Sequence, residues 1–205
     1  MNAALLCAEL SKAAYAGPHD IDVGAFRAIV RDTGRAGAQF NESGGEAAGI
    51  GRVLAIAGTD DITTTLADLE AIAPHWAPEL GVEVPAGFLW PVRGALHAIR
   101  ASGPIQVITG HSLGGALALI TAAMLDHWRP DQTRTVYAFA PPRVGPVRLS
   151  GPTYLFRLGE DIVPTLPPDF RQPRPLIRLG RAQSWLGDHE IDHYIAALEK
   201  SHEQP

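Results

Sequence analysis

The sequence has little of what disulfide-rich or nucleic-acid-binding proteins require. Its 205 residues include one cysteine, Cys7, so an intrachain disulfide is excluded and the thiol is expected to be a small buried hydrophobe. Basic residues are outnumbered, 17 Lys and Arg against 22 Asp and Glu, and the net charge of −5 leaves no excess of cations to neutralise phosphates. We therefore expect no nucleic-acid partner.

Long hydrophobic runs and an export signal are also missing. The longest apolar stretch runs from Leu113 to Leu125 and ends at Asp126, which makes it shorter than the roughly 18 residues of a membrane span. The first fifteen residues have no basic region and space Leu6 and Leu10 on one face of a helix. The sequence thus predicts no transmembrane span and no signal peptide, and it leaves the location open between the cytoplasm and export by another route.

What is present is the composition of one globular domain, residues 1–205. Hydrophobic residues make up 46% and charged residues 19%, which suits a single sizeable core. Short β-branched runs alternate with longer Ala- and Leu-rich patterns, and this alternation predicts an α/β fold with a mainly parallel central sheet flanked by helices. Predicted strands are 105–109, 135–140, 153–158 and, at an edge, 176–179. Predicted helices are 62–72, 90–101, 113–128 and 191–200.

Two further segments have clear local signals. Strands at 36–41 and 49–57 flank the turn-prone residues 42–45 and predict an N-terminal hairpin. Five prolines between residues 164 and 175 exclude a regular helix there, so this stretch is predicted to be a loop.

The clearest chemical signal is the G-x-S-x-G motif from Gly110 to Gly114. It follows the predicted strand 105–109 and opens the predicted helix 113–128, which is the context of a nucleophile elbow. A serine hydroxyl acts as a nucleophile where it projects freely toward a base, and flanking glycines relieve the crowding at such a turn. The helix N-terminus adds unpaired N–H groups and the positive end of its dipole. Ser112 is therefore the candidate nucleophile.

Five more segments occur in an order typical of one family. They are Ala55-Ile56-Ala57-Gly58-Thr59, Asp68-Leu69, Gly87-Phe88, 138–145 (Ala-Phe-Ala-Pro-Pro-Arg-Val-Gly) and 159–168 (Gly-Glu-Asp-Ile-Val-Pro-Thr-Leu-Pro-Pro). With the elbow, they resemble the class 3 lipases, the fungal-lipase-like branch of the α/β-hydrolases. The sequence departs from the family pattern at four positions, which are Ala57, Pro85, Ala140 and Gly159. The resemblance implies an α/β-hydrolase fold and an ester hydrolase that needs no metal or cofactor.

The triad acid is expected after the strand 153–158, because this fold orders its triad as Ser, acid, His. Asp161 lies there and matches the family pattern N-x-D-x-V-P, while the adjacent Glu160 is the rival candidate. The resemblance thus implies that Asp161 is the acid that acts with Ser112.

The oxyanion of the reaction requires two hydrogen-bond donors. Elbow geometry indicates the backbone N–H of Leu113, and the resemblance implies Thr59 as the second donor. Asp68 would support the Thr59 loop or would be merely solvated. Residues 62–80 lie where relatives carry a lid, and they are predicted to form either a lid or a fixed connector.

Two histidines compete for the role of base, because residues 189–193 also match the zinc motif H-E-x-x-H. The family pattern D-H-S-x-x-x-Y-I fits when His189 is the base, which leaves His193 as a solvated helix residue. A zinc site needs both histidines on one buried helix face. The apolar stripe of this segment consists of Ile191, Tyr194, Ile195 and Leu198. It places both histidines opposite the core, which argues against a zinc site.

The function indicated is a serine carboxylester hydrolase, a lipase or esterase, that cleaves lipid or other esters through an acyl-enzyme intermediate. Transient binding to a lipid interface is consistent with this function. Two alternatives stay open. The first is a non-catalytic ligand-binding protein on the same fold, and the second is an H-E-x-x-H zinc hydrolase.

Overall fold

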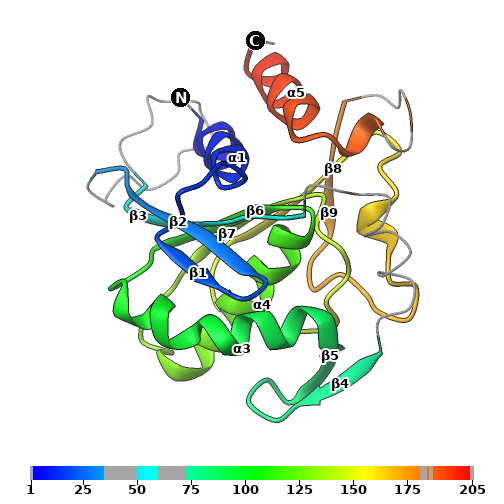
Figure 1. Ribbon diagram of the computed structural model, residues 1–205. Helices are drawn as coiled ribbons and strands as arrows, with labels where there is room; N and C mark the ends of the chain where they lie inside the picture. The colour runs from blue at the N-terminus through cyan, green and yellow to red at the C-terminus, as the bar shows by residue number, and fades with distance from the viewer. Residues whose placement is uncertain (1, 35–49, 60–72, 181–183, 185–186, 204–205) are drawn as a thin grey trace.

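A central β-sheet with helices on both faces forms the body of the molecule (Figure 1). The computed structural model describes residues 2–34, 50–59, 73–180, 184 and 187–203. Within them, the strands of the main sheet lie in the order β1-β2-β3-β6-β7-β8-β9. Their bounds are β1 Ile21–Val23, β2 Phe26–Asp32, β3 Arg52–Ile56, β6 Val107–His111, β7 Thr135–Phe139, β8 Thr153–Leu158 and β9 Leu176–Leu179. Strands β3, β6, β7, β8 and β9 run parallel, so the predicted mainly parallel sheet is confirmed.

The helices pack on both faces of the sheet, so the hydrophobic core has two layers. Helices α1 (Ala3–Ala13) and α5 (Ile191–Glu203) cover one face of the sheet, and α3 (Ala86–Ala101) and α4 (Leu113–Trp128) cover the other (Figure 1). Phe139 and Tyr194 are buried in the first layer, and Phe88 and Leu117 in the second. Cys7 of α1 is fully buried, as predicted. No helix among the described residues is long and apolar enough to cross a membrane.

The elements around the predicted elbow are present, although β6 spans Val107–His111 where 105–109 was predicted, so the strand includes Gly110 and His111 of the motif. Strand β6 is buried along its whole length, as expected of a strand covered on both faces, and α4, β8 and β9 have the predicted bounds. The proline-rich segment contains one short 3-10 helix, Val163–Thr165, and no α-helix. A 3-10 helix of three residues is a single turn and is compatible with the predicted loop.

The predicted N-terminal hairpin is present, but β1 and β2 are its strands. The pairing of Val23 with Phe26 leaves a two-residue turn in which Gly24 has φ +59°, a conformation that glycine adopts without strain. Of the strands predicted for this hairpin, 36–41 lies outside the described residues. The segment 49–57 contains β3, which pairs antiparallel with β2.

Around residues 60–90 one predicted element differs from the structure, and the other predictions lie largely outside the described residues. The helix 62–72, and with it most of the proposed lid or connector, lies outside the described residues. Residues that follow form a second sheet, a hairpin of β4 (Pro74–Ala77) and β5 (Val82–Pro85) beside α3 (Figure 1). Helix α3 begins at Ala86, four residues before the predicted start, because Phe88 and Leu89 bury its first turn in the core.

Candidate active site

The candidate residues lie after the carboxyl ends of neighbouring parallel strands. Ile56 of β3 pairs with Gly110 of β6, so Thr59 and Ser112 leave the sheet at the same edge. Asp161 follows the end of β8 at that edge. Open α/β sheets bind their ligands in this position.

Ser112 has the strained backbone of a nucleophile elbow. Its φ of 56° lies in the left-handed region, and its N–H donates to the carbonyl of Phe139 at 2.9 Å. A Cβ on Gly110 would lie 2.3 Å from the carbonyl oxygen of Gly114, and a Cβ on Gly114 would lie 2.2 Å from that of Ile56. Close backbone approach therefore requires glycine on both sides of the serine.

The serine hydroxyl is buried and has no hydrogen-bond partner among the described residues. Ser112 is 1% exposed, and its Oγ makes no hydrogen bond to any described residue. Leu113 is the first residue of α4, so its N–H has no acceptor within the helix. Thr59 is exposed and lines, together with His111 and His189, a cavity of about 390 Å³.

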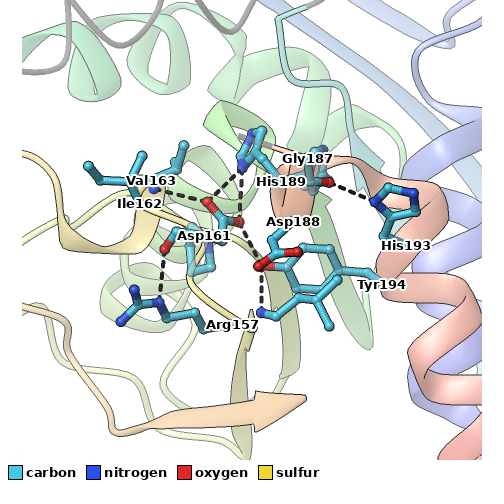
Figure 2. A network of polar contacts seen from close by, with 12 residues as sticks. Arg157, Asp161, Ile162, Val163, Gly187, Asp188, His189, His193 and Tyr194 are labelled. Atoms are coloured by element: carbon cyan, nitrogen blue, oxygen red, sulfur yellow. Dashed lines mark hydrogen bonds and ion pairs between the residues drawn. The ribbon is translucent and has the colours of Figure 1, made fainter. Parts of the chain in front are cut away.

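Asp161 and His189 form a buried pair (Figure 2). The Nδ1–H of His189 donates to both carboxylate oxygens of Asp161, at 3.1 Å to Oδ1 and 3.0 Å to Oδ2. Their exposed fractions are 0% for Asp161 and 4% for His189, so little water competes for this contact. The rival acid Glu160 has a side chain that is 63% exposed, and it lies 3.7 Å from Arg157.

The position of His189 differs from the helical-wheel expectation. His189 belongs to a 3-10 helix, Gly187–His189, that precedes α5, and it does not continue the phase of that helix. The ring is therefore buried, where the wheel had placed it opposite the core. His193 is exposed on α5, as predicted, and its Nδ1 lies 2.6 Å from the carbonyl of Gly187 (Figure 2).

This separation bears on the H-E-x-x-H motif. The two histidines belong to different elements and contact different partners, so they do not form the shared helix face that a zinc site needs. No group of three potential ligands among the described residues could hold a metal ion. Asp68, the predicted supporting residue, lies outside the described part of the chain.

Tyr194 completes the surroundings of the carboxylate of Asp161. Its hydroxyl accepts the N–H of Leu158 at 2.9 Å and donates to Oδ2 of Asp161 at 2.7 Å (Figure 2). The N–H of Val163 donates to Oδ1 at 3.0 Å. Burial, and then the negative charge of Asp161, hold the pKa of Tyr194 well above its usual range, so the phenol keeps its proton and remains a donor.

Asp188 connects the loop of Asp161 to the loop of His189 by hydrogen bonds. Its buried carboxylate accepts the N–H of Glu160 at 2.9 Å and the N–H of Ser184 at 3.3 Å. Since Glu160 and Asp188 are the chain neighbours of Asp161 and His189, this contact fixes the loop of the acid against the loop of the histidine.

His111 connects the histidine loop to the segment after α1. Its Nε2 lies 2.7 Å from the carbonyl oxygen of His189, which only accepts, so Nε2 carries the proton. In the neutral ring Nδ1 is then the acceptor for the hydroxyl of Tyr15 at 2.8 Å. Burial, and then the charge of nearby His189, hold the pKa of His111 well below its usual range, which favours this neutral form.

Sequence reasoning did not assign roles to Tyr15, Asp188 or Tyr194. It placed Tyr194 in the apolar stripe of the last helix, where the ring is indeed buried. The available signal was the hydroxyl, because a buried tyrosine needs a polar partner for its tip.

The sheet, its helices and its N-terminal hairpin form the α/β-hydrolase-like fold of the fungal lipases. Residues 53–171 match the family model described as Lipase (class 3). This match covers more than half of the chain, and the protein belongs to the class 3 lipase family.

Individual relatives are distant. Secreted mono- and diacylglycerol lipase 1 of Fusarium solani is 36% identical over 106 residues, which are 43% of this chain and 31% of that protein. The chain thus spans about a third of the length of this curated relative.

Solved structures resemble the chain over a larger part. The Rhizomucor miehei lipase in complex with its propeptide has 27% identity and a TM-score of 0.52, over 62% of this chain and 48% of that one. The mono- and diacylglycerol lipase of Aspergillus oryzae has 25% identity and a TM-score of 0.53, over 65% and 55%. A triacylglycerol lipase described as having a serine protease triad has 21% identity and a TM-score of 0.56, over 80% and 73%, and this likeness supports the fold alone.

Proposed function

We propose that this protein is a serine carboxylester hydrolase in which Ser112, His189 and Asp161 form the triad. The observation that carries the proposal is the buried contact of His189 Nδ1 with both oxygens of Asp161. The ring of His189 lies 4.7 Å, centroid to centroid, from that of His111, the chain neighbour of the elbow serine with its strained backbone. Because Nδ1–H points to the carboxylate, Nε2 is the nitrogen left to take a proton from a nucleophile.

The reaction follows from these roles. Ser112 Oγ attacks the ester carbonyl as its proton passes to Nε2 of His189, and the negative charge moves to the carbonyl oxygen. The N–H of Leu113, at the start of α4, and Thr59 would bind this oxyanion. Collapse of the intermediate expels the alcohol, which takes the proton from His189. Water then hydrolyses the acyl-enzyme by the same steps, releasing the acid and restoring the serine.

An acylglycerol is the substrate class we favour. Two of the relatives are named as mono- and diacylglycerol lipases, and the chain has no need of a metal or cofactor for this chemistry. Comparing hydrolysis of an emulsified acylglycerol with hydrolysis of a soluble p-nitrophenyl ester would distinguish a lipase from an esterase.

The test of the proposal is the variant Ser112→Ala. We expect the rate to fall by a factor on the order of 10⁶, because the members of a triad act as a unit, while the fold is retained. Ser102→Ala, at the half-buried C-cap of α3, is the control. A burst of p-nitrophenol and a single organophosphate adduct on Ser112 should accompany wild-type activity. A ligand-binding protein without activity would give neither the burst nor the adduct.

A further inference from the structure

A cavity of about 770 Å³ lies away from the candidate active site, near the C-terminal end of α4. Ala123 of α4 belongs to its wall, and at 1.5 Å per helical residue this residue lies roughly 16 Å along the helix from Ser112. Val147 and Leu149, from the segment between β7 and β8, give the wall an apolar part. The volume falls within the range of about 300–1,000 Å³ that is usual for small-molecule sites.

Three arginines line this cavity. Arg148 comes from the segment between β7 and β8, and Arg171 and Arg174 come from the segment before β9. All three are exposed, and none forms an ion pair with a carboxylate within the described part of the chain. One guanidinium is fixed in place, since Arg174 donates to the carbonyl of Leu149 at 2.9 Å.

The two acidic residues of the wall are already neutralised. Both carboxylate oxygens of Glu79 accept from Arg93, each at 2.8 Å. Asp126 pairs with Arg134 at 3.0 Å and accepts the N–H of Ser150 at 2.8 Å. The cavity therefore presents unpaired positive charge in a protein whose net charge is −5.

A second cavity, of about 620 Å³, shares Pro146 and Arg171 with the first. Trp76 of β4, which is 55% exposed, and Phe170 offer aromatic surface there. Glu83 and Asp169 also line this second cavity. The first cavity, with all three arginines and both of its carboxylates paired, would thus attract an anion more strongly than the second, where Glu83 and Asp169 lie beside Arg171. An apolar chain attached to that anion would meet aromatic rings in the second cavity.

We propose that these adjoining cavities bind one anionic amphiphile, a long-chain carboxylate, whose head lies against Arg148, Arg171 and Arg174 and whose chain lies against Trp76 and Phe170. The concave shape favours a single molecule over a membrane surface. The proposal does not depend on the catalytic triad, because none of its three residues lines either cavity.

The test is a calorimetric titration of laurate, below its micelle concentration, into the whole protein and into the double variant Arg148→Gln/Arg171→Gln. We expect the affinity to fall at least tenfold in the double variant and to fall in the wild type as sodium chloride is added, because the head contact is ionic. Arg178→Gln is the matched control, since Arg178 is an exposed arginine on β9 outside both cavities. Trp76→Ser should weaken laurate binding while the binding of acetate stays as it is.

Three results would overturn the proposal. The first is equal binding of laurate by the double variant and the wild type. The second is equal binding of laurate and dodecyltrimethylammonium by the wild type. The third comes from sedimentation with phosphatidylglycerol vesicles. If the double variant lost vesicle binding but kept its affinity for monomeric laurate, these arginines would form a membrane-binding face instead. Thermal unfolding of each variant checks that the exposed substitutions leave the fold intact.

Discussion

The phenolic oxygen of Tyr194 lies 2.7 Å from Oδ2 of Asp161, the same oxygen that His189 Nδ1 reaches at 3.0 Å. One carboxylate oxygen thus holds both the candidate base and a tyrosine that is itself fixed by the N–H of Leu158. Tyr194 is fully buried, so its effect on catalysis has to act through the position of Asp161.

Tyr194→Phe should therefore lower kcat and leave KM nearly unchanged. We expect a loss of about tenfold in kcat, equivalent to ~1.4 kcal/mol, because the carboxylate loses a donor and becomes less well oriented. The N–H of Leu158 also loses its acceptor, which should cost about 1–3 kcal/mol in the free energy of unfolding. Steady-state kinetics and urea unfolding measure the two effects. Tyr154→Phe is the control, since the ring of Tyr154 stacks on Tyr137 and its hydroxyl donates no hydrogen bond within the described residues. A changed KM with unchanged kcat would contradict the positioning role.

The two histidines of the last segment should differ sharply. His189→Ala should reduce the rate about as much as Ser112→Ala, and the double variant should be no worse, because triad members are not additive. His193→Ala should keep most of the activity, since its ring is exposed and, among the described residues, hydrogen-bonds to the carbonyl of Gly187 alone. Kinetics with and without a chelator complete the test. Inactivation by the chelator, reversed by zinc, would establish the alternative zinc mechanism.

Gly114→Ala should disrupt the elbow. The added methyl group would lie 2.2 Å from the carbonyl oxygen of Ile56, and because that oxygen belongs to the backbone of β3, the strand or the helix has to move. We expect a loss of about 1–3 kcal/mol in the free energy of unfolding and a large loss of activity. Gly94→Ala is the matched control on the exposed side of α3, where a Cβ meets nothing closer than 3.9 Å. This control should raise the stability by about 0.5–1 kcal/mol. Equal stability of the two variants would refute the close approach.

The burial of neutral His111 should make the stability depend on pH. Its pKa is lowered in the folded state, so below the ordinary histidine pKa of about 6.5 the unfolded chain binds a proton that the folded protein does not. The free energy of unfolding should therefore be unaffected by His111 above pH ~6.5 and should decrease as the pH falls below that value. In His111→Leu this part of the pH dependence should vanish, whereas Tyr15→Phe, which keeps the imidazole, should retain it. Urea unfolding at about pH 8 and about pH 5 makes the comparison, and parallel curves for wild type and His111→Leu would exclude the linkage.

The parts of the fold that could be predicted are those in which a local pattern decides the conformation. The start of α4 follows from the glycine-rich elbow, and its end at Trp128 lies three residues after the apolar run from Leu113 to Leu125. The family resemblance and the N-x-D-x-V-P pattern pointed to Asp161, which is indeed buried against His189.

Other features depend on contacts between distant segments. Strand β1 has three residues, one of them buried, and only its pairing with β2 makes it a strand. The burial of His189 depends on a short 3-10 helix. A helical wheel drawn for an α-helix assumes about 3.6 residues per turn and therefore gives the wrong direction for this side chain. The partners of Tyr194 and His111 lie 33 to 96 residues away along the chain, so no local pattern indicates them.

The buried cysteine makes the protein convenient for site-specific labelling. Cys7 is 0% exposed, and burial raises the pKa of its thiol far above the usual range, so the reactive thiolate is scarce. A maleimide dye should consequently not react with Cys7 in the folded protein. A single cysteine introduced at an exposed site such as Arg178 would then carry one fluorophore per molecule, and ligand binding could be followed by its emission without removing the natural thiol.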